Sequence, residues 1–165
     1  MVTLRRMTGD EFAQWREKSI VGYAADLATA TGVGLDSARD RARNQFSELL
    51  PNGPASERTW LLRILDESDT HVGVLWIGPH PQQGGTAFIY EIEIAEAHRG
   101  RGLGKQAMTK AEELAAAAGF TQISLNVFGF NETARRLYDS LGYRVVSTVM
   151  SKPLAATGES DPPEV

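Results

Sequence analysis

The sequence predicts a single domain of the α/β (α+β) class, in which helices pack on a mixed β-sheet. The chain has 165 residues, enough for one core that buries roughly 70% of the unfolded surface. Apolar residues alternate with polar ones in several short segments and recur at helical spacing in others. Along the chain these segments follow the order β-α-α-β-β-β-α-β-α-β, which is typical of a sheet with packed helices.

The first half of the chain contains two predicted helices flanked by predicted strands. The signature Thr8-Gly9-Asp10-Glu11 places acidic residues in a first helical turn. A glycine-containing break at 31–34 separates the helices, and the turn Pro51-Asn52-Gly53-Pro54 ends the second. The predicted elements are a strand at 2–5, helices from about 10 to 30 and from 36 to 50, and strands at 59–65 and 71–77.

The second half alternates strands with helices. Gly119 and Gly142 follow runs of helical spacing and are suited to helix C-termini. The polar, proline-bearing segment 153–165 is expected to be a disordered tail, so the domain is expected at 1–152. The predicted elements are a central strand at 87–95, a helix at 103–118, a strand at 122–128, a helix at 131–141 and a final strand at 143–150.

Composition excludes several classes of function. The net charge of −4 gives no sign of binding to nucleic acid or to an anionic membrane. The absence of cysteine excludes disulfides, thiolate metal sites and a cysteine nucleophile, and His71, His80 and His98 lack the spacing of metal ligands. With neither a signal-peptide pattern nor a membrane-length apolar run, we expect a cytoplasmic protein without a metal.

The segment His98-Arg99-Gly100-Arg101-Gly102-Leu103-Gly104-Lys105 joins the central strand to the next helix. Its glycines remove side chains where backbone N–H groups could face a ligand. The helix start adds unpaired N–H groups and the positive end of the dipole. Arg99, Arg101 and Lys105 add positive charge to an acidic chain, so we expect this glycine loop to bind a phosphate or pyrophosphate.

Two common phosphate loops do not match this segment. A Walker loop needs four residues between its first glycine and Gly-Lys, followed by Ser or Thr, whereas Gly100 and Gly104 enclose three residues and Gln106 follows Lys105. A dinucleotide fingerprint would need glycine at position 105. A nucleotide-phosphate enzyme therefore remains a third hypothesis, and a simple tight turn remains the structural alternative for the glycines alone.

Two motifs together resemble the GCN5-related N-acetyltransferase (GNAT) superfamily, in its small bacterial single-domain form. They are Arg99-x-x-Gly102-x-Gly104 after one strand and Asn131-x-x-Ala134-x-x-x-Tyr138-x-x-x-Gly142-Tyr143 after the next. The resemblance covers 87–152 well, and Ala97-His98 departs from the aromatic that often precedes the arginine. It implies a mixed, mostly antiparallel sheet that splays between two strands, with helices on both faces.

The resemblance also implies that the co-substrate is acetyl-CoA. Its pyrophosphate would lie on the glycine loop, and its pantetheine arm would pair with the strand at Ile92 and Ile94, whose side chains are expected in the core. Asn131 would bond the arm or simply cap its helix. The implied cofactor-binding residues are Ile92, Ile94, Arg99, Gly100, Arg101, Gly102, Leu103, Gly104, Lys105, Asn131 and Ala134.

Three residues are candidate catalytic groups. The family's matching tyrosine donates a proton to the leaving thiolate, a role that falls on Tyr138, although a buried core tyrosine is the alternative. By the two-residue period of a strand, Glu91 and Glu93 share one face, opposite Tyr90, Ile92 and Ile94. Either carboxylate could accept the amine proton or only attract a cationic substrate, and Glu93 is preferred because it is nearer the splay.

The resulting prediction is an acetyl-CoA-dependent N-acetyltransferase that acts on a primary amine by direct attack in a ternary complex. The Ile94 N–H would polarise the thioester carbonyl. The alternative is a non-catalytic acyl-CoA-binding or sensor module on the same fold. The acceptor, a small-molecule or peptide amine, is left open, with its pocket expected from the helices within 10–50 and the loops at 51–57 and 78–85. Dimers are frequent in the superfamily, which leaves a homodimer open.

Overall fold

The computed structural model describes residues 1–152 and residue 154. Its five strands form one sheet in the order β1-β2-β3-β4-β5, with β4 and β5 parallel and the other neighbours antiparallel. This confirms the predicted α/β class with a mixed, mostly antiparallel sheet. The elements are β1 (Thr3–Arg6), α1 (Gly9–Thr31), α2 (Leu35–Leu49), η1 (Gly53–Ala55), β2 (Trp60–Leu65), β3 (His71–Pro79), β4 (Thr86–Ile94), η2 (Glu96–His98), α3 (Leu103–Ala117), β5 (Gln122–Leu125) and α4 (Glu132–Ser140).

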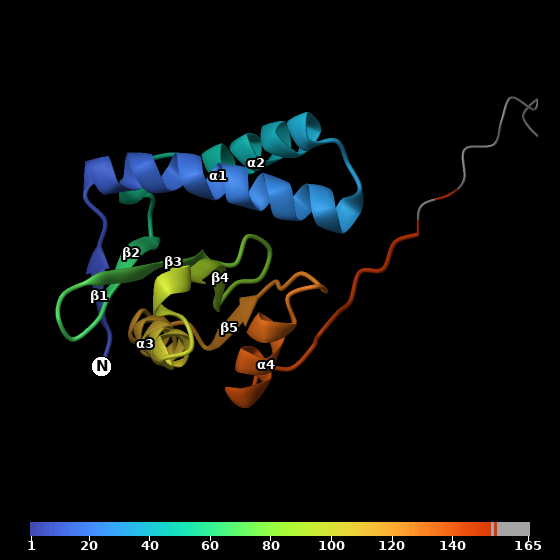
Figure 1. Ribbon diagram of the computed structural model, residues 1–165. Coiled ribbons are helices and arrows are strands. Elements are labelled where there is room, and N and C mark those ends of the chain that lie inside the picture. The colour runs from blue at the N-terminus through green and yellow to red at the C-terminus, as the bar shows by residue number, and fades with distance from the viewer. Residues whose placement is uncertain (153, 155–165) are drawn as a thin grey trace, which may run out of the picture.

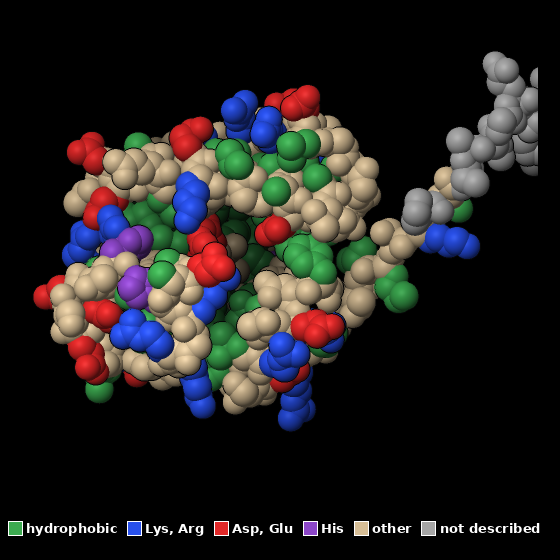
Figure 2. Space-filling view, in the orientation of Figure 1, with side chains coloured by type: hydrophobic (Ala, Val, Ile, Leu, Met, Phe, Trp, Pro, Cys, Tyr) green, Lys and Arg blue, Asp and Glu red, His purple; other side chains and the backbone are tan. Residues whose placement is uncertain are grey.

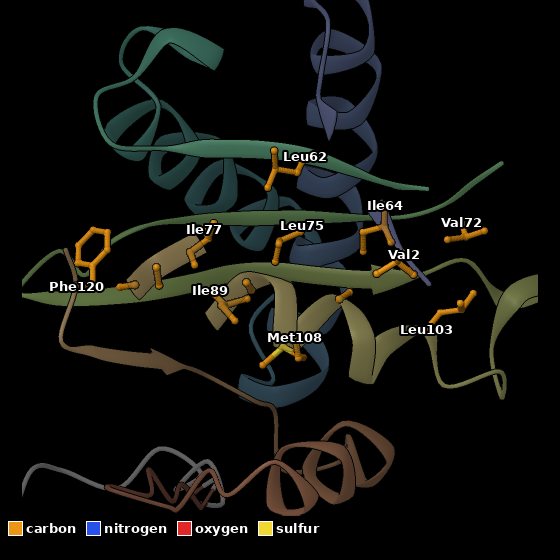
Figure 3. Packing of buried hydrophobic residues seen from close by; sticks show 14 residues of the cluster. Val2, Leu62, Ile64, Val72, Leu75, Ile77, Ile89, Leu103, Met108 and Phe120 are labelled. Carbon is orange, nitrogen blue, oxygen red and sulfur yellow. The ribbon is translucent and has the colours of Figure 1, made fainter. Parts of the chain in front are cut away.

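The helices form two layers, with α1 and α2 on one face of the sheet and α3 and α4 on the other (Figure 1). Between the sheet and α3, buried aliphatic side chains such as Leu75, Ile89 and Met108 form one cluster of the core (Figure 3). On the α1–α2 face a second cluster is more aromatic and includes Trp15 and Trp76, whose rings lie edge to face with centroids 5.5 Å apart. Apolar burial on both faces stabilises the sheet.

Helix α1 begins as its sequence predicts. The Thr8 hydroxyl accepts a hydrogen bond from the Glu11 N–H at 3.3 Å, and the Glu11 carboxylate accepts one from the Thr8 N–H at 2.9 Å. This reciprocal capping box pairs backbone donors that the first turn would otherwise leave unpaired. The helix ends at Gly32, whose φ of 74° is favourable for glycine. These caps fix the start and end of the helix that faces the candidate site.

Strand β4 departs from strict alternation at one residue. Trp76 of β3 pairs with Glu91, but the next residue, Ile77, pairs with Ile89, so Tyr90 is the extra residue of a β-bulge. The predicted placement of Tyr90 on the Ile92 face is therefore wrong. Its ring instead stacks on Trp76 in the α1–α2 layer, with centroids 4.6 Å apart. The bulge puts two successive side chains, Tyr90 and Glu91, on the same face.

The predicted last strand at 143–150 is wrong for this structure, because no strand forms after α4 within the described residues. A strand needs a neighbour to pair its backbone groups, and this segment runs away from the body of the molecule (Figure 1). Strand β5 is also shorter than predicted and ends at Leu125 rather than 128. Most of the predicted tail at 153–165 lies outside the described residues.

Candidate active site

The site centres on the part of β4 that extends beyond its pairing with β5. Pairing between β4 and β5 runs from Thr86–Gln122 to Ile89–Leu125, whereas β4 continues to Ile94. We call residues 86–89 the paired half of β4 and residues 90–94 the open half. In the open half, backbone groups on the β5 side have no strand to pair with, so they can accept an extended ligand. This confirms the splay that the family resemblance implies.

The glycine loop has the backbone conformation that its glycines suggest. Gly100 and Gly102 have φ angles of 75° and 74°, a left-handed region that other L-residues rarely adopt. A Cβ at either position would meet no atom within 4 Å, so conformation rather than packing requires glycine there. Gly102 is the N-cap of α3 and provides no side-chain cap. The first N–H groups of α3 are thus available to an anion, at the positive end of its dipole.

Gly104 lies where three elements of the structure meet. A Cβ on this residue would lie 3.4 Å from Leu137 Cδ2 of α4 and 3.8 Å from Ile94 Cγ1 of β4. The start of α3, the helix α4 and the end of the open half therefore converge around this position. The structure brings the glycine loop, Ile94 and the α4 face together, as the resemblance implies.

The three basic side chains of the loop differ in what they contact. Arg99 donates a hydrogen bond from Nε to the Ile94 carbonyl at 2.8 Å, so the last carbonyl of the open half already has a partner. Arg101 lies 3.6 Å from the Asp66 carboxylate and 3.3 Å from His98 Nδ1. Backbone N–H bonds, with a smaller contribution from Arg101, lower the pKa of Asp66. Lys105 is exposed on the first turn of α3.

Glu91 is held against α1, on the face of the sheet away from α3. Its carboxylate accepts a hydrogen bond from the Ser19 hydroxyl at 3.0 Å. Burial raises the pKa of Glu91 to about 7, as does the charge of Glu93, while the Ser19 bond and the nearby Trp15 indole act in the opposite direction. A carboxyl with this pKa exchanges its proton near neutral pH, which suits a general base.

Glu93 lies on the same face of β4 as Glu91, as its alternation with Ile92 and Ile94 predicts. Its side chain is 40% exposed and lies 3.6 Å from Lys18 Nζ and 3.9 Å from the Arg99 guanidinium. Both cations therefore form ion pairs with this carboxylate. The choice of Glu93 as the preferred base stays a prediction, and Glu91 is the more buried of the two carboxylates.

Asn131 and Tyr138 lie on the first and last turns of the α4 region. Asn131 caps the helix, because its Oδ1 accepts from the Ala134 N–H at 3.1 Å, and this leaves its amide N–H groups for another partner. Tyr138 packs against the core, and burial raises the pKa of its phenol. Because its pKa is raised, the phenol stays protonated near neutral pH and can donate a proton.

A pocket of about 350 Å³ lies on the α1–α2 side, beside the bulge. Tyr90 and Phe88 of β4 line it together with Glu48 of α2, His80 after β3 and Asn126 after β5. Helix α2 and the 78–85 loop were expected to form an acceptor pocket, whereas the 51–57 loop does not line this one. The molecule is also hollowed between its two helical layers, with acidic side chains at the rim and apolar ones inside (Figure 2).

Sequence reasoning missed the α1 residues that hold the two carboxylates. Trp15 and Ser19 are four residues apart and both buried, whereas Lys18 is exposed beside Glu93. The available signal was Ser19 itself, a polar residue on the buried stripe of α1. Buried polar groups need a partner, and pairing that stripe with an acidic strand face would have suggested Glu91.

Two further features of the described residues bear on the class of protein. No group of three His, Asp or Glu side chains gathers there as a set of metal ligands. Over the same residues, no helix combines the length and the hydropathy that crossing a membrane requires.

Comparison with known proteins shows the class to which this fold and site belong, that of N-acetyltransferases. YycN of Bacillus subtilis, an uncharacterised N-acetyltransferase, is 35% identical over 158 residues, covering 93% of this chain and 99% of YycN. YdgE of the same organism, also an uncharacterised N-acetyltransferase, is 32% identical over 92% of this chain and 98% of its own. The crystal structure of YycN superposes with a TM-score of 0.87 at 31% identity, covering 94% and 99% of the two chains.

The model of the acetyltransferase (GNAT) family matches residues 26–143. The chain therefore belongs to the GNAT acetyltransferase family.

Proposed function

We infer that the protein transfers an acetyl group from acetyl-CoA to a primary amine, by direct attack of the amine in a ternary complex. One observation carries the proposal: Glu91, with a pKa of about 7, lies on the open half of β4, which ends against the glycine loop. Amine acetylation by a CoA thioester requires a general base and a site that binds the phosphates of CoA. Here Glu91 is the base and the start of α3 is the phosphate-binding site, and both adjoin the open half of β4.

The residues at the opening fit acetyl-CoA. The left-handed glycines Gly100 and Gly102 leave the N–H groups at the start of α3 unobstructed, which suits a pyrophosphate. The open half of β4 at Ile92 and Ile94 would pair with the amides of the pantetheine arm. The amide nitrogen of Asn131, which the cap does not use, would donate to the same arm.

Acetyl-CoA supplies an activated thioester, and the chain supplies the proton transfers around it. Glu91 accepts the proton that the amine nitrogen releases as its new bond to the acetyl carbon forms, and the Tyr138 hydroxyl donates a proton to sulfur as the bond between carbon and sulfur breaks. The Ile94 N–H would polarise the carbonyl. A lysine-type amine costs about 4.6 kcal/mol to deprotonate at neutral pH and an α-amine about 1.4 kcal/mol, so the base matters most for lysine-type acceptors.

The acceptor is proposed to enter from the α1–α2 side. There Tyr90, which precedes Glu91 on the same face of β4, lines the pocket, and Glu48 places a carboxylate in its lining. An acidic, aromatic-walled pocket favours a cationic acceptor, either a small-molecule amine or a peptide amine. Its volume of about 350 Å³ suits a side chain or a small amine.

The test is mass spectrometry of a library of amines and peptides incubated with the full-length protein and acetyl-CoA. An acetylated product from at least one amine class supports the proposal. If the protein binds acetyl-CoA and no amine class is acetylated, the protein is instead a non-catalytic acyl-CoA-binding or sensor module on the same fold.

A further inference from the structure

Helix α1 has one glycine in its interior, Gly22. Apart from proline, glycine is the least favourable residue inside a helix, because it loses the most backbone freedom on folding. Conformation does not require glycine here, since the backbone of Gly22 is that of an ordinary α-helix without a positive φ. Packing does not require it either, because a Cβ on Gly22 would have no atom of the described chain within 4 Å. This residue therefore leaves space that the fold itself does not need.

The open space at Gly22 lies on the side of α1 that faces the candidate site. Residues three and four apart are neighbours on one side of a helix, so Gly22 lies one turn beyond Ser19 and Lys18. The Ser19 hydroxyl donates a hydrogen bond to Glu91 at 3.0 Å, and Lys18 Nζ lies 3.6 Å from the Glu93 carboxylate. Gly22 is therefore on the same side of the helix as the contacts to both carboxylates of the open half of β4.

The residue after Gly22 contacts a different part of the molecule, the segment that follows β5. The ring of Tyr23 lies 6.3 Å from the ring of Phe128, which stacks on Phe130 with centroids 5.4 Å apart. Contacts just before Gly22 thus reach the open half of β4, and the contact just after it reaches the end of β5. Gly22 therefore lies over the place where β4 and β5 separate, and the molecule is hollowed there beneath α1 (Figure 2).

The surroundings of Gly22 suit an amine that extends outward into solvent. Asp26, four residues further along the same side of α1, is exposed and adds a carboxylate to those of Glu91 and Glu93. Phe130, which is 53% exposed, adds an aromatic ring. Carboxylates and aromatic faces both attract an ammonium group. Because Gly22 is itself exposed, the amine of an acceptor can reach inward while the rest of the acceptor stays outside, as the end of a peptide would.

We propose that Gly22 is a specificity-determining residue, and that the space it leaves admits an acceptor with a substituent on the carbon that bears the amine, as in the α-amine of a peptide. A straight-chain amine, such as that of a lysine side chain, has only hydrogens and its own chain on this carbon and needs less room. A side chain at position 22 would occupy the same space, so it would exclude the substituted amine first. The inference rests on the proposed function and narrows its acceptor to one class.

The test compares two tripeptides that differ only in the substituent beside the α-amine, leucyl-alanyl-alanine and glycyl-alanyl-alanine. Acetylation by the full-length protein and acetyl-CoA gives kcat/KM for each peptide. We expect Gly22→Leu to lower kcat/KM about tenfold or more for the leucyl peptide and less than about threefold for the glycyl peptide, with KM for acetyl-CoA unchanged. Ala13→Leu is the matched control and should behave as wild type, because Ala13 is exposed and lies nine residues before Gly22, on the opposite side of α1.

Gly22→Ala separates the need for space from a need of the fold. Alanine favours a helix more than glycine does, so the denaturation midpoint is expected to rise while kcat/KM for the leucyl peptide falls. A purely structural role would move stability and activity in the same direction. A lower midpoint for Gly22→Ala would show that the fold itself requires glycine at this position and would overturn the inference.

The remaining outcomes distinguish this inference from the proposed function. If Gly22→Leu lowers kcat/KM equally for both peptides, or for neither, the inference fails and the proposed function stands. If the wild-type protein acetylates neither peptide but acetylates another amine of the library, the acceptor class is wrong and the inference fails in the same way. If the wild-type protein acetylates no amine at all, the proposed function fails and the inference falls with it.

Discussion

The two halves of β4 have different surroundings although they form one continuous strand. In the paired half, residues 86–89 have strands on both sides, and Ala87 and Ile89 are buried in the core against α3. In the open half, residues 90–94 have a strand on the β3 side alone, and every residue there is partly exposed. The paired half holds the sheet together, and the open half carries the candidate chemistry.

Two local features produce this difference. The divergence of β5 after Leu125 opens the backbone edge, and the bulge at Tyr90 places Glu91 on the α1 face. A single strand can therefore position a ligand through its backbone and a base through its side chain. The comparison predicts that substitutions in the open half change catalysis and those in the paired half change stability.

The largest expected effect is that of Glu91→Gln. Loss of a general base typically lowers turnover by about 10²–10⁴-fold, so we expect kcat to fall in that range with acetyl-CoA affinity unchanged. Glu93→Gln on the same face is the matched control, with a loss of about tenfold or less. Steady-state kinetics and calorimetry would measure both variants. If Glu93→Gln has the larger effect on kcat, the assignment of the base is reversed.

In the paired half, Ile89→Ala is expected to act on stability instead. Ile89 is 4% exposed, and removing a buried isoleucine side chain typically costs about 2–5 kcal/mol of unfolding free energy. Denaturant titration would measure this loss. The folded variant is expected to keep the wild-type affinity for acetyl-CoA, and a large loss of affinity at wild-type stability would contradict the division between the halves.

Tyr138→Phe tests the proposed proton donor. Removing the hydroxyl while keeping the ring should preserve packing, so we expect kcat to fall by about 10²-fold with little change in acetyl-CoA affinity. Tyr143→Phe on the neighbouring ring is the control and should leave kcat near its wild-type value. Equal losses of affinity and turnover in Tyr138→Phe would show that this tyrosine only supports the fold.

The pKa of Glu91 also predicts how stability depends on pH. Since the folded value of about 7 lies above the ordinary 4.5, the folded state holds a proton that the unfolded chain releases within this window. Stability conferred by the protonated group is therefore lost as pH rises from 4.5 to about 7. Relative to wild type, Glu91→Gln should gain about 1–3 kcal/mol in unfolding free energy between pH 4 and pH 8. A pH-independent difference between the two proteins would contradict the raised pKa.

The smallest effect is expected in the glycine loop. Gly102→Ala places a Cβ in a left-handed conformation, at a cost of about 1–2 kcal/mol, and should weaken acetyl-CoA binding several-fold. Gly84→Ala is the control, because that glycine has an ordinary φ and open space around it. Calorimetry that shows equal affinities for the two variants would mean that the loop conformation does not govern binding.

Local signals were sufficient to predict much of the fold. Thr8 and Glu11 predicted the start of α1, and the glycines at 100, 102 and 104 predicted the turn into α3. The shared face of Glu91 and Glu93 followed from strand alternation. Each of these signals lies within a few consecutive residues, where local backbone preferences determine the conformation.

Contacts between distant segments could not be predicted in this way. The bulge at Tyr90 depends on packing against Trp76, and the burial of Glu91 depends on Ser19, 72 residues away. Segment 143–150 was predicted to be a strand from its apolar side chains, but it forms none in the described structure, because a sequence pattern does not specify a pairing partner.

Hydrogen exchange of the full-length protein with and without CoA would show where the co-substrate binds. We expect CoA to slow exchange at residues 90–94 and 99–105 and to leave the paired half of β4 unchanged. Strong protection elsewhere on the molecule, with no change in these two segments, would contradict the claim that the open half of β4 and the glycine loop hold the co-substrate.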